Sequence, residues 1–345
     1  MMQTAPQLPT AAPGASRDKP IAGKPVSMTR LDFWRAYATT MRPYLLPVSG
    51  LAGLVGMSLA GPLSPWRFAL GLLTFTLSYG FGQALTDCFQ QDTDRLSAPY
   101  RPLVRGRVSA AQVLAVSLTG LVLGAVTLAL LNPWNLAVGA AAVAGLLIYT
   151  PLKRRWWAGP IANAWVVALL PIMGWLVNPV NSPAQLKNEW LVLIVALAAL
   201  AAYANFVLVG YLKDIAADRQ AGYETFPVRF GWRATALLSH AWAISALVAT
   251  AAVVWLLTSG RWPSAWVAWS VLGLAALVTL VAQAMLHRID REEQANRPIV
   301  LVVRVFLLLQ AAITVAAQPM WWPVAAAFCG AFELLVAMRP DRRQV

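Results

Sequence analysis

The sequence predicts an all-α membrane protein, a polytopic bundle of nine to ten transmembrane helices. Hydrophobic residues make up 59% of the 345-residue chain and charged residues only 12%, too few charges to cover the surface of a soluble protein of this length. Apolar stretches of about 20 residues, the length that spans a bilayer as a helix, recur along the chain. The basic residues fall almost entirely on one side of the layout that these stretches define.

The chain divides into two tails and one membrane domain. Residues 1–29 are rich in Pro, Ala and Gly and have no apolar core, which predicts a disordered tail and not a signal peptide. Residues 30–338 form the expected transmembrane domain, and residues 339–345 a cytoplasmic C-terminal tail. The expected spans lie near 42–61, 66–86, 111–131, 134–151, 158–177, 190–212, 233–257, 264–286, 299–317 and 320–338. Only QPMWWP separates the last two, so the count is nine or ten.

The basic residues predict the orientation. With a cytoplasmic N-terminus, 23 of the 27 Lys and Arg fall on the cytoplasmic side, three (Arg67, Lys187 and Arg261) on the other, and Arg304 inside a span. This asymmetry follows the positive-inside rule. We therefore expect an integral protein of a cytoplasmic or inner membrane. Its topology and the anionic inner leaflet account for the net charge of +13 without a nucleic-acid partner.

Two polar loops on the cytoplasmic side hold six of the 14 acidic residues. The first, residues 86–109, reads TDCFQQDTDRLSAPYRPLVRGRVS, and the second, residues 211–231, reads YLKDIAADRQAGYETFPVRFG. Each follows a long apolar segment. If the preceding helices continue into the loops, each loop presents two carboxylates on one helical face. The pairs are Asp87 with Asp94, two turns apart, and Asp214 with Asp218, one turn apart.

Carboxylates that meet from two helix ends repel each other unless a cation lies between them. A ligand set of oxygens alone favours Mg²⁺, which completes its coordination with waters and phosphate oxygens. Nearby basic side chains can bind the remaining phosphate charge: these are Arg101, Arg105, Arg107, Lys153, Arg154 and Lys213. For either loop alone the alternative is a solvated loop whose Asp and Arg neutralise each other. Together they predict a site for a metal-chelated anion with an apolar tail.

The loops resemble the signatures of the UbiA superfamily of intramembrane prenyltransferases. The first signature, N-D-x-x-D-x-x-x-D followed by P-x-R-P and a glycine, is matched by Asp87, Asp94, Pro99, Arg101, Pro102 and Gly106. The second, D-x-x-x-D followed by a glycine, is matched by Asp214, Asp218 and Gly222. YTPLKRR at 149–155 places Lys153 where the family has a diphosphate-contacting lysine. The resemblance runs from about residue 40 to 317, and GQALTD and APYRP are most similar to the chlorophyll-synthase branch.

The resemblance implies a bundle around a central cavity and an Mg²⁺-dependent reaction. An isoprenoid diphosphate would ionise, and a lipophilic acceptor (an aromatic ring, a tetrapyrrole or another lipid) would capture the cation with release of pyrophosphate. The implied metal ligands are Asp87, Asp94, Asp214 and Asp218. The implied diphosphate-binding residues are Arg101, Lys153, Lys213 and Arg105.

The first signature departs from the family pattern at two positions. Thr86 replaces the usual Asn, and Gln90 replaces the middle Asp. The amide oxygen of Gln90 can still bind a metal but brings no charge. Asp92 can supply the missing carboxylate only if the helix ends before it.

Polar residues within the spans tend to face the bundle interior, so Asn163, Asn205 and Tyr149 are expected to line the cavity. Two other functions are compatible with the sequence. The altered first signature is consistent with an intramembrane terpene cyclase. Ten spans with buried polar groups are consistent with a transporter or lipid-binding protein, although the acidic residues cluster on one side and no pair of broken helices repeats.

Overall fold

The computed structural model describes residues 25–186, 189–261 and 265–339. The predicted N-terminal tail up to residue 24 and the C-terminal tail from residue 340 therefore lie outside the described residues. At the start of the described part, the backbone N–H of Val26 donates to the carbonyl of Arg107 and Gln112 donates to the carbonyl of Val26. Contacts with the body of the protein thus begin a few residues before the predicted domain start at residue 30.

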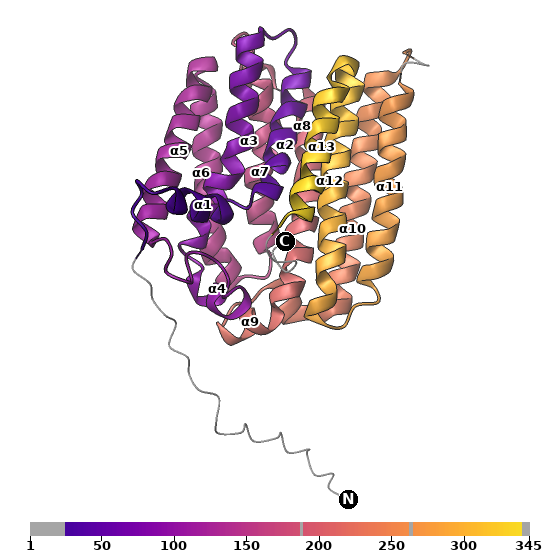
Figure 1. Cartoon of the computed structure of the whole chain (residues 1–345). Coiled ribbons are helices and arrows are strands. Elements are labelled where there is room, and N and C mark those ends of the chain that lie inside the picture. Colours follow the sequence, from indigo (N-terminus) through magenta and orange to yellow (C-terminus); the bar gives the residue numbers. More distant parts are fainter. Residues whose placement is uncertain (1–24, 187–188, 262–264, 340–345) are drawn as a thin grey trace, which may run out of the picture.

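The described part of the chain is helical and contains no strand. Figure 1 shows an upright bundle with short helices at one end. In chain order the elements are α1 (Leu31–Thr40), η1 (Pro43–Leu45), α2 (Leu46–Leu59), α3 (Pro65–Asp87), α4 (Gln91–Ser97), α5 (Ala110–Leu131), α6 (Asn135–Arg155), α7 (Gly159–Trp175), η2 (Pro183–Gln185), α8 (Trp190–Gly210), η3 (Tyr211–Asp214), α9 (Ile215–Gln220), α10 (Phe226–Thr258), α11 (Trp266–Leu286), η4 (Glu292–Ala295), α12 (Asn296–Ala317), η5 (Pro319–Trp321) and α13 (Trp322–Ala337).

Each of the ten predicted spans coincides with one apolar helix, which confirms the all-helical fold class. Among the described residues, eight helices are long and apolar enough to cross a membrane by length and composition. The other two apolar segments, Pro43–Leu59 and Gly159–Trp175, are shorter. The exact count of nine or ten spans therefore stays a prediction.

The two shorter helices, α2 and α7, pack against each other at the centre of the bundle. A Cβ added at Gly56 of α2 would lie 1.9 Å from the carbonyl oxygen of Pro171, and one added at Gly174 of α7 would lie 2.2 Å from that of Gly53. Glycine is thus required for this approach, as is common between membrane helices. Helices α3, α5 and α6 lie on one side of this centre, and α10, α11 and α12 on the other (Figure 1).

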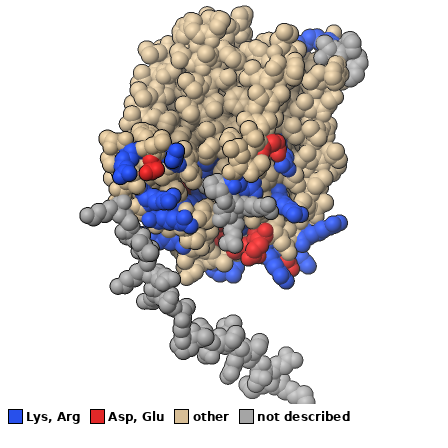
Figure 2. Space-filling view, viewed as in Figure 1, with Lys and Arg blue, Asp and Glu red and all other residues tan. Residues whose placement is uncertain are grey.

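The charged residues gather at the end of the bundle that carries α4 and α9 (Figure 2). Helices α4 and α9, which lie in the two predicted acidic loops, are in contact there. The first loop does not continue the preceding helix, because α3 ends at Asp87 and a new helix starts at Gln91. The expectation that Asp87 and Asp94 share one helical face is therefore wrong.

Candidate active site

A cavity of about 680 Å³ lies between α3, α5, α6, α7 and α8. One face of α6 lines it from Asn135 to Lys153, about 27 Å at the rise of an α-helix. At the charged end its walls carry Arg42, Gln90, Asp94, Arg101, Lys153, Lys213, Asp214 and Asp218. Farther in, the walls are mainly apolar and include Phe75, Gly124, Leu128, Val143 and Leu170. The cavity therefore joins an ionic end to a long apolar compartment.

The second acidic motif lies on the cavity wall as the spacing predicts. Asp214 ends η3 and Asp218 lies in α9, which follows without a break. Asp218 is fully buried (0% exposed). Thr225 donates to its Oδ2 at 3.2 Å, because the turn after α9, with Gly222 at φ 75°, brings the chain back. Its Oδ1 lies 3.7 Å from Nζ of Lys153 and has no hydrogen-bond partner.

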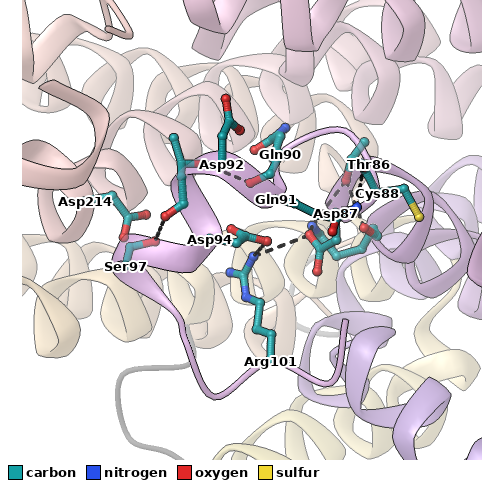
Figure 3. A network of polar contacts seen from close by, with 12 residues as sticks. Thr86, Asp87, Cys88, Gln90, Gln91, Asp92, Asp94, Ser97, Arg101 and Asp214 are labelled. Carbon is teal, nitrogen blue, oxygen red and sulfur yellow. Dashed lines mark hydrogen bonds and ion pairs between the residues drawn. The ribbon is translucent and has the colours of Figure 1, made fainter. Parts of the chain in front are cut away.

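The first acidic motif is arranged differently, because its carboxylates are paired with arginines. Nη2 of Arg42 donates to both oxygens of Asp87, at 2.9 and 3.2 Å. Arg101 extends between the two acidic residues (Figure 3): its Nη1 forms an ion pair with Asp94 and lies 3.6 Å from Asp87. Gln83 also donates to Asp87, at 2.9 Å. Asp87 is not among the residues that line the cavity, whereas Asp94, Arg42 and Arg101 are.

Burial shapes the charge balance of this pair. Burial raises the pKa of Asp94, and the guanidinium of Arg101 opposes that rise. Burial alone would lower the pKa of Arg101, but Asp87 and Asp94 outweigh it and hold that pKa above its ordinary value. Arg101 is therefore a permanent positive charge at the mouth of the cavity.

The two side chains that depart from the family pattern are both hydrogen-bonded within this region. The hydroxyl of Thr86 donates to the carbonyl of Gln83 at 2.9 Å. The amide of Gln90 donates to the Thr150 hydroxyl and accepts from Lys153, each at 3.4 Å. Asp92 does not supply the missing carboxylate even though α3 has ended before it. It lies 2.8 Å from Arg154 and accepts from the Tyr223 hydroxyl, and it does not line the cavity.

The other predicted site residues divide into two groups. Lys213, Tyr149 and Asn163 line the cavity, and Tyr211 donates to the Tyr149 hydroxyl at 3.2 Å. Two are not brought to it. Arg105 is exposed on the loop after α4, and Asn205 is buried elsewhere in the bundle with an unpaired Oδ1.

Arg42 is a site residue that no sequence motif indicates. Its side chain lines the cavity and contacts Asp87. The one feature of the sequence that indicates it is its position, an arginine at the start of the first expected span.

Within the described residues, no three acidic, histidine or cysteine side chains converge so as to hold a metal ion by themselves. The second motif nevertheless fits a hard divalent cation. Its donors are carboxylate oxygens, and Asp218 Oδ1 is a buried oxygen without a hydrogen-bond partner. A cation there would complete its coordination with oxygens of a bound anion and water.

Membrane-spanning helices, an ionic cavity mouth and an apolar interior define a class of protein that handles an anion with a long apolar tail. Comparison with known proteins identifies the family within this class. A model of the UbiA prenyltransferase family matches residues 47–302. Digeranylgeranylglyceryl phosphate synthase from Natronomonas pharaonis is 30% identical over 218 residues, which cover 63% of this chain and 76% of that protein.

Two solved structures share the fold. A UbiA homologue from Aeropyrum pernix K1 has a TM-score of 0.64 and 22% identity, covering 79% of this chain and 97% of that chain. A UbiA homologue from Archaeoglobus fulgidus bound to GPP and Mg²⁺ has a TM-score of 0.58 and 19% identity, covering 81% of this chain and 99% of that chain. The chain belongs to the UbiA prenyltransferase family. It is an integral membrane prenyltransferase.

Proposed function

We propose that this enzyme transfers a prenyl group from an isoprenoid diphosphate to a lipophilic acceptor in an Mg²⁺-dependent reaction. The observation that carries the proposal is the cavity itself, which joins Asp214, Asp218, Lys153 and Arg101 at one end to apolar walls along α6. The diphosphate would occupy the ionic end and the prenyl chain the apolar compartment. The Archaeoglobus fulgidus homologue bound to GPP and Mg²⁺ supports this class of donor.

Asp214 and Asp218 would hold Mg²⁺, which when bound neutralises the diphosphate and stabilises the leaving pyrophosphate. Lys153 and Arg101 would bind diphosphate oxygens at the cavity mouth. The bond between the allylic carbon and the diphosphate oxygen breaks, and its electron pair leaves with the pyrophosphate. The acceptor then bonds to the allylic carbon and loses a proton. The apolar walls exclude water, which would otherwise capture the cation.

The acceptor is a lipophilic nucleophile, and an aromatic ring, a tetrapyrrole and a lipid alcohol are all compatible with the cavity. The name of the Natronomonas pharaonis relative, digeranylgeranylglyceryl phosphate synthase, places a glycerol phosphate lipid first in the order of testing. The chlorophyll-synthase-like sequence details stay a prediction, tested by a tetrapyrrole acceptor.

The test is pyrophosphate release by the purified protein in lipid nanodiscs, supplied with an allylic diphosphate and each acceptor class, with products identified by mass spectrometry. We expect release to require Mg²⁺ and Asp218→Asn to lower it about 100-fold or more. Asp92→Asn is the matched control, because Asp92 belongs to the same polar region but faces Arg154. Unchanged release in Asp218→Asn would contradict the proposal. A cyclic hydrocarbon formed without acceptor would identify a terpene cyclase instead.

We further propose that the charged end faces the cytoplasm, which the distribution of 23 basic residues against three supports. The test introduces one cysteine into a variant in which Cys88 and Cys329 are replaced by serine. With a membrane-impermeant maleimide on intact cells, Val180→Cys, at the opposite end, should be labelled. Glu224→Cys should be labelled only after lysis. The reverse pattern would overturn this orientation.

A further inference from the structure

We propose that this enzyme holds one divalent cation, on Asp214 and Asp218, and that Arg42 and Arg101 supply the charge of a second. In this arrangement Asp87 and Asp94 are positioning residues for the two arginines and do not bind metal. The inference rests on the proposed function, since it assigns the groups that neutralise the diphosphate.

Asp87, the first carboxylate of this motif, has no free face toward the cavity. Both oxygens of Asp87 accept from Arg42, one also accepts from Gln83, and its side chain is only 5% exposed. Arg101 forms an ion pair with Asp94 and also approaches Asp87 (Figure 3). Two carboxylates are thus matched by two guanidiniums, and the four charges cancel locally.

The charge that a ligand meets depends on which of these groups border the cavity. Both arginines and Asp94 line the cavity, whereas Asp87 does not. A guanidinium is planar and presents several donors, so one side can contact a carboxylate while the other binds a phosphate oxygen. Two guanidiniums and one carboxylate of this region thus border the cavity. Their net charge toward a ligand is positive, whereas a metal-binding motif would present a net negative charge to a metal.

The rest of the first motif cannot replace the lost ligands. Thr86 and Gln90 are neutral, and their oxygens are engaged by Gln83 and Lys153. Asp92 is the remaining carboxylate of this segment, and it is directed to Arg154 and Tyr223. Each of the three carboxylates of residues 86–97 is thus paired with an arginine.

The second motif contrasts with the first. Asp218 Oδ1 is buried and has no hydrogen-bond partner. In the second motif the amine of Lys153 lies 3.7 Å from Asp218, and that of Lys213 lies 3.7 Å from Asp214. A small cation can therefore bind these carboxylates if the lysine amines move to phosphate oxygens. One ion and two fixed arginines would then neutralise the diphosphate together.

The experiment counts the ions bound by the full-length protein in nanodiscs, using Mn²⁺ detected by electron paramagnetic resonance in the presence of inorganic pyrophosphate. We expect one Mn²⁺ per chain in the wild type and none in Asp218→Asn. Asp94→Asn should keep the ion but bind pyrophosphate about 10-fold more weakly, because Arg101 loses its nearest partner. Gln90→Asp, which restores the missing carboxylate, should bind a second ion. Asp92→Asn should match the wild type in both measurements.

Two Mn²⁺ ions in the wild type would overturn the inference while leaving Mg²⁺-dependent prenyl transfer intact. The inference would also be overturned if Asp94→Asn lost the ion while its unfolding temperature was unchanged. It would likewise be overturned if Gln90→Asp bound only one Mn²⁺ ion. Absence of any Mn²⁺ in the wild type would overturn the inference together with the metal dependence of the proposed function. Product formation, measured in parallel, separates these cases.

Discussion

Arg42 has a left-handed backbone conformation, with φ at 52°, and it is the only non-glycine residue with positive φ in the described part of the chain. Such a conformation costs of order 1 kcal/mol and persists where surrounding contacts fix it. Here the contacts are the two hydrogen bonds to Asp87. The strained residue is therefore one that places a charge at the mouth of the cavity.

Arg42→Lys keeps the charge but cannot reproduce these two hydrogen bonds while also facing the cavity. One charge-assisted hydrogen bond is worth about 1.5–3 kcal/mol, so we expect kcat/KM for the diphosphate to fall about 10- to 100-fold. Pyrophosphate release at varied donor concentration measures this. Arg35→Lys is the control, because Arg35 lies on the exposed side of α1, where it pairs with Asp32. A kcat/KM equal to the wild type would show that Arg42 does not contact the donor.

The sequence predicts the second acidic motif better than the first, for a physical reason. Asp214 and Asp218 are four residues apart in nearly continuous helix, so spacing alone places them together. Between Asp87 and Asp94 the helix breaks, and no Gly or Pro marks the break. Which oxygens stay free depends on arginines about 45 residues before and 14 after Asp87, a long-range contact that local patterns do not contain.

At the level of the helices, the close contact of α2 with α7 leaves no room for a side chain at position 56, where the residue is glycine. An added methyl group would lie 1.9 Å from the Pro171 carbonyl, and both atoms belong to buried helices. We expect Gly56→Ala to cost about 1–3 kcal/mol or more through overpacking, seen as a lower unfolding temperature in detergent. At Gly273 of α11 no atom lies within 4 Å of an added Cβ. Gly273→Ala should therefore leave the temperature unchanged or raise it. Equal effects at both positions would contradict this packing argument.

Helix α13 is joined to α12 by an ion pair between Arg304 and Glu333. Nη2 of Arg304 donates to Oε2 of Glu333 at 2.6 Å, and its Nε contacts Oε1. Both side chains are partly exposed on the outside of the bundle, where an unpaired charge is costly in a bilayer.

Glu333→Gln should therefore destabilise the protein, because it leaves Arg304 unpaired. Arg304→Gln together with Glu333→Gln should recover part of the loss. We expect a coupling of about 1–3 kcal/mol in a double-mutant cycle of unfolding free energies measured in bicelles. Additive single effects would mean that the pair contributes nothing to the attachment of α13.

For the whole molecule, the sequence predicts the helices but not their places. Each apolar segment became one helix, because only a helix satisfies its own backbone in a bilayer. Lipid and protein interior are equally apolar, however, so helix composition does not reveal that α8 and α12 are mostly buried whereas few residues of α5 and α6 are buried. The only local indication of where a helix lies in the bundle is the glycine content of residues 46–59. The structure explains it by the close packing of α2 against α7.

The depth of the cavity leads to a prediction about donor chain length. Gly139 lines the cavity 14 residues from Lys153 along α6, about 21 Å at the helical rise. Each five-carbon unit of an extended prenyl chain spans about 5 Å, from carbon–carbon bonds of about 1.5 Å. About four units therefore separate Gly139 from the diphosphate end. The atom nearest to a Cβ added there is a methyl carbon of Met173, at 3.8 Å.

Gly139→Leu should then obstruct only chains that reach it. We expect the rate with a 20-carbon donor to fall about 10-fold or more, as an overpacked contact costs about 1–3 kcal/mol, while a 10-carbon donor reacts as with the wild type. The ratio of kcat/KM for the two donors measures this. Gly273→Leu, a substitution of equal size away from the cavity, should leave the ratio unchanged. If Gly139→Leu slowed both donors alike, the prenyl chain would have to lie along another part of the cavity and not along α6.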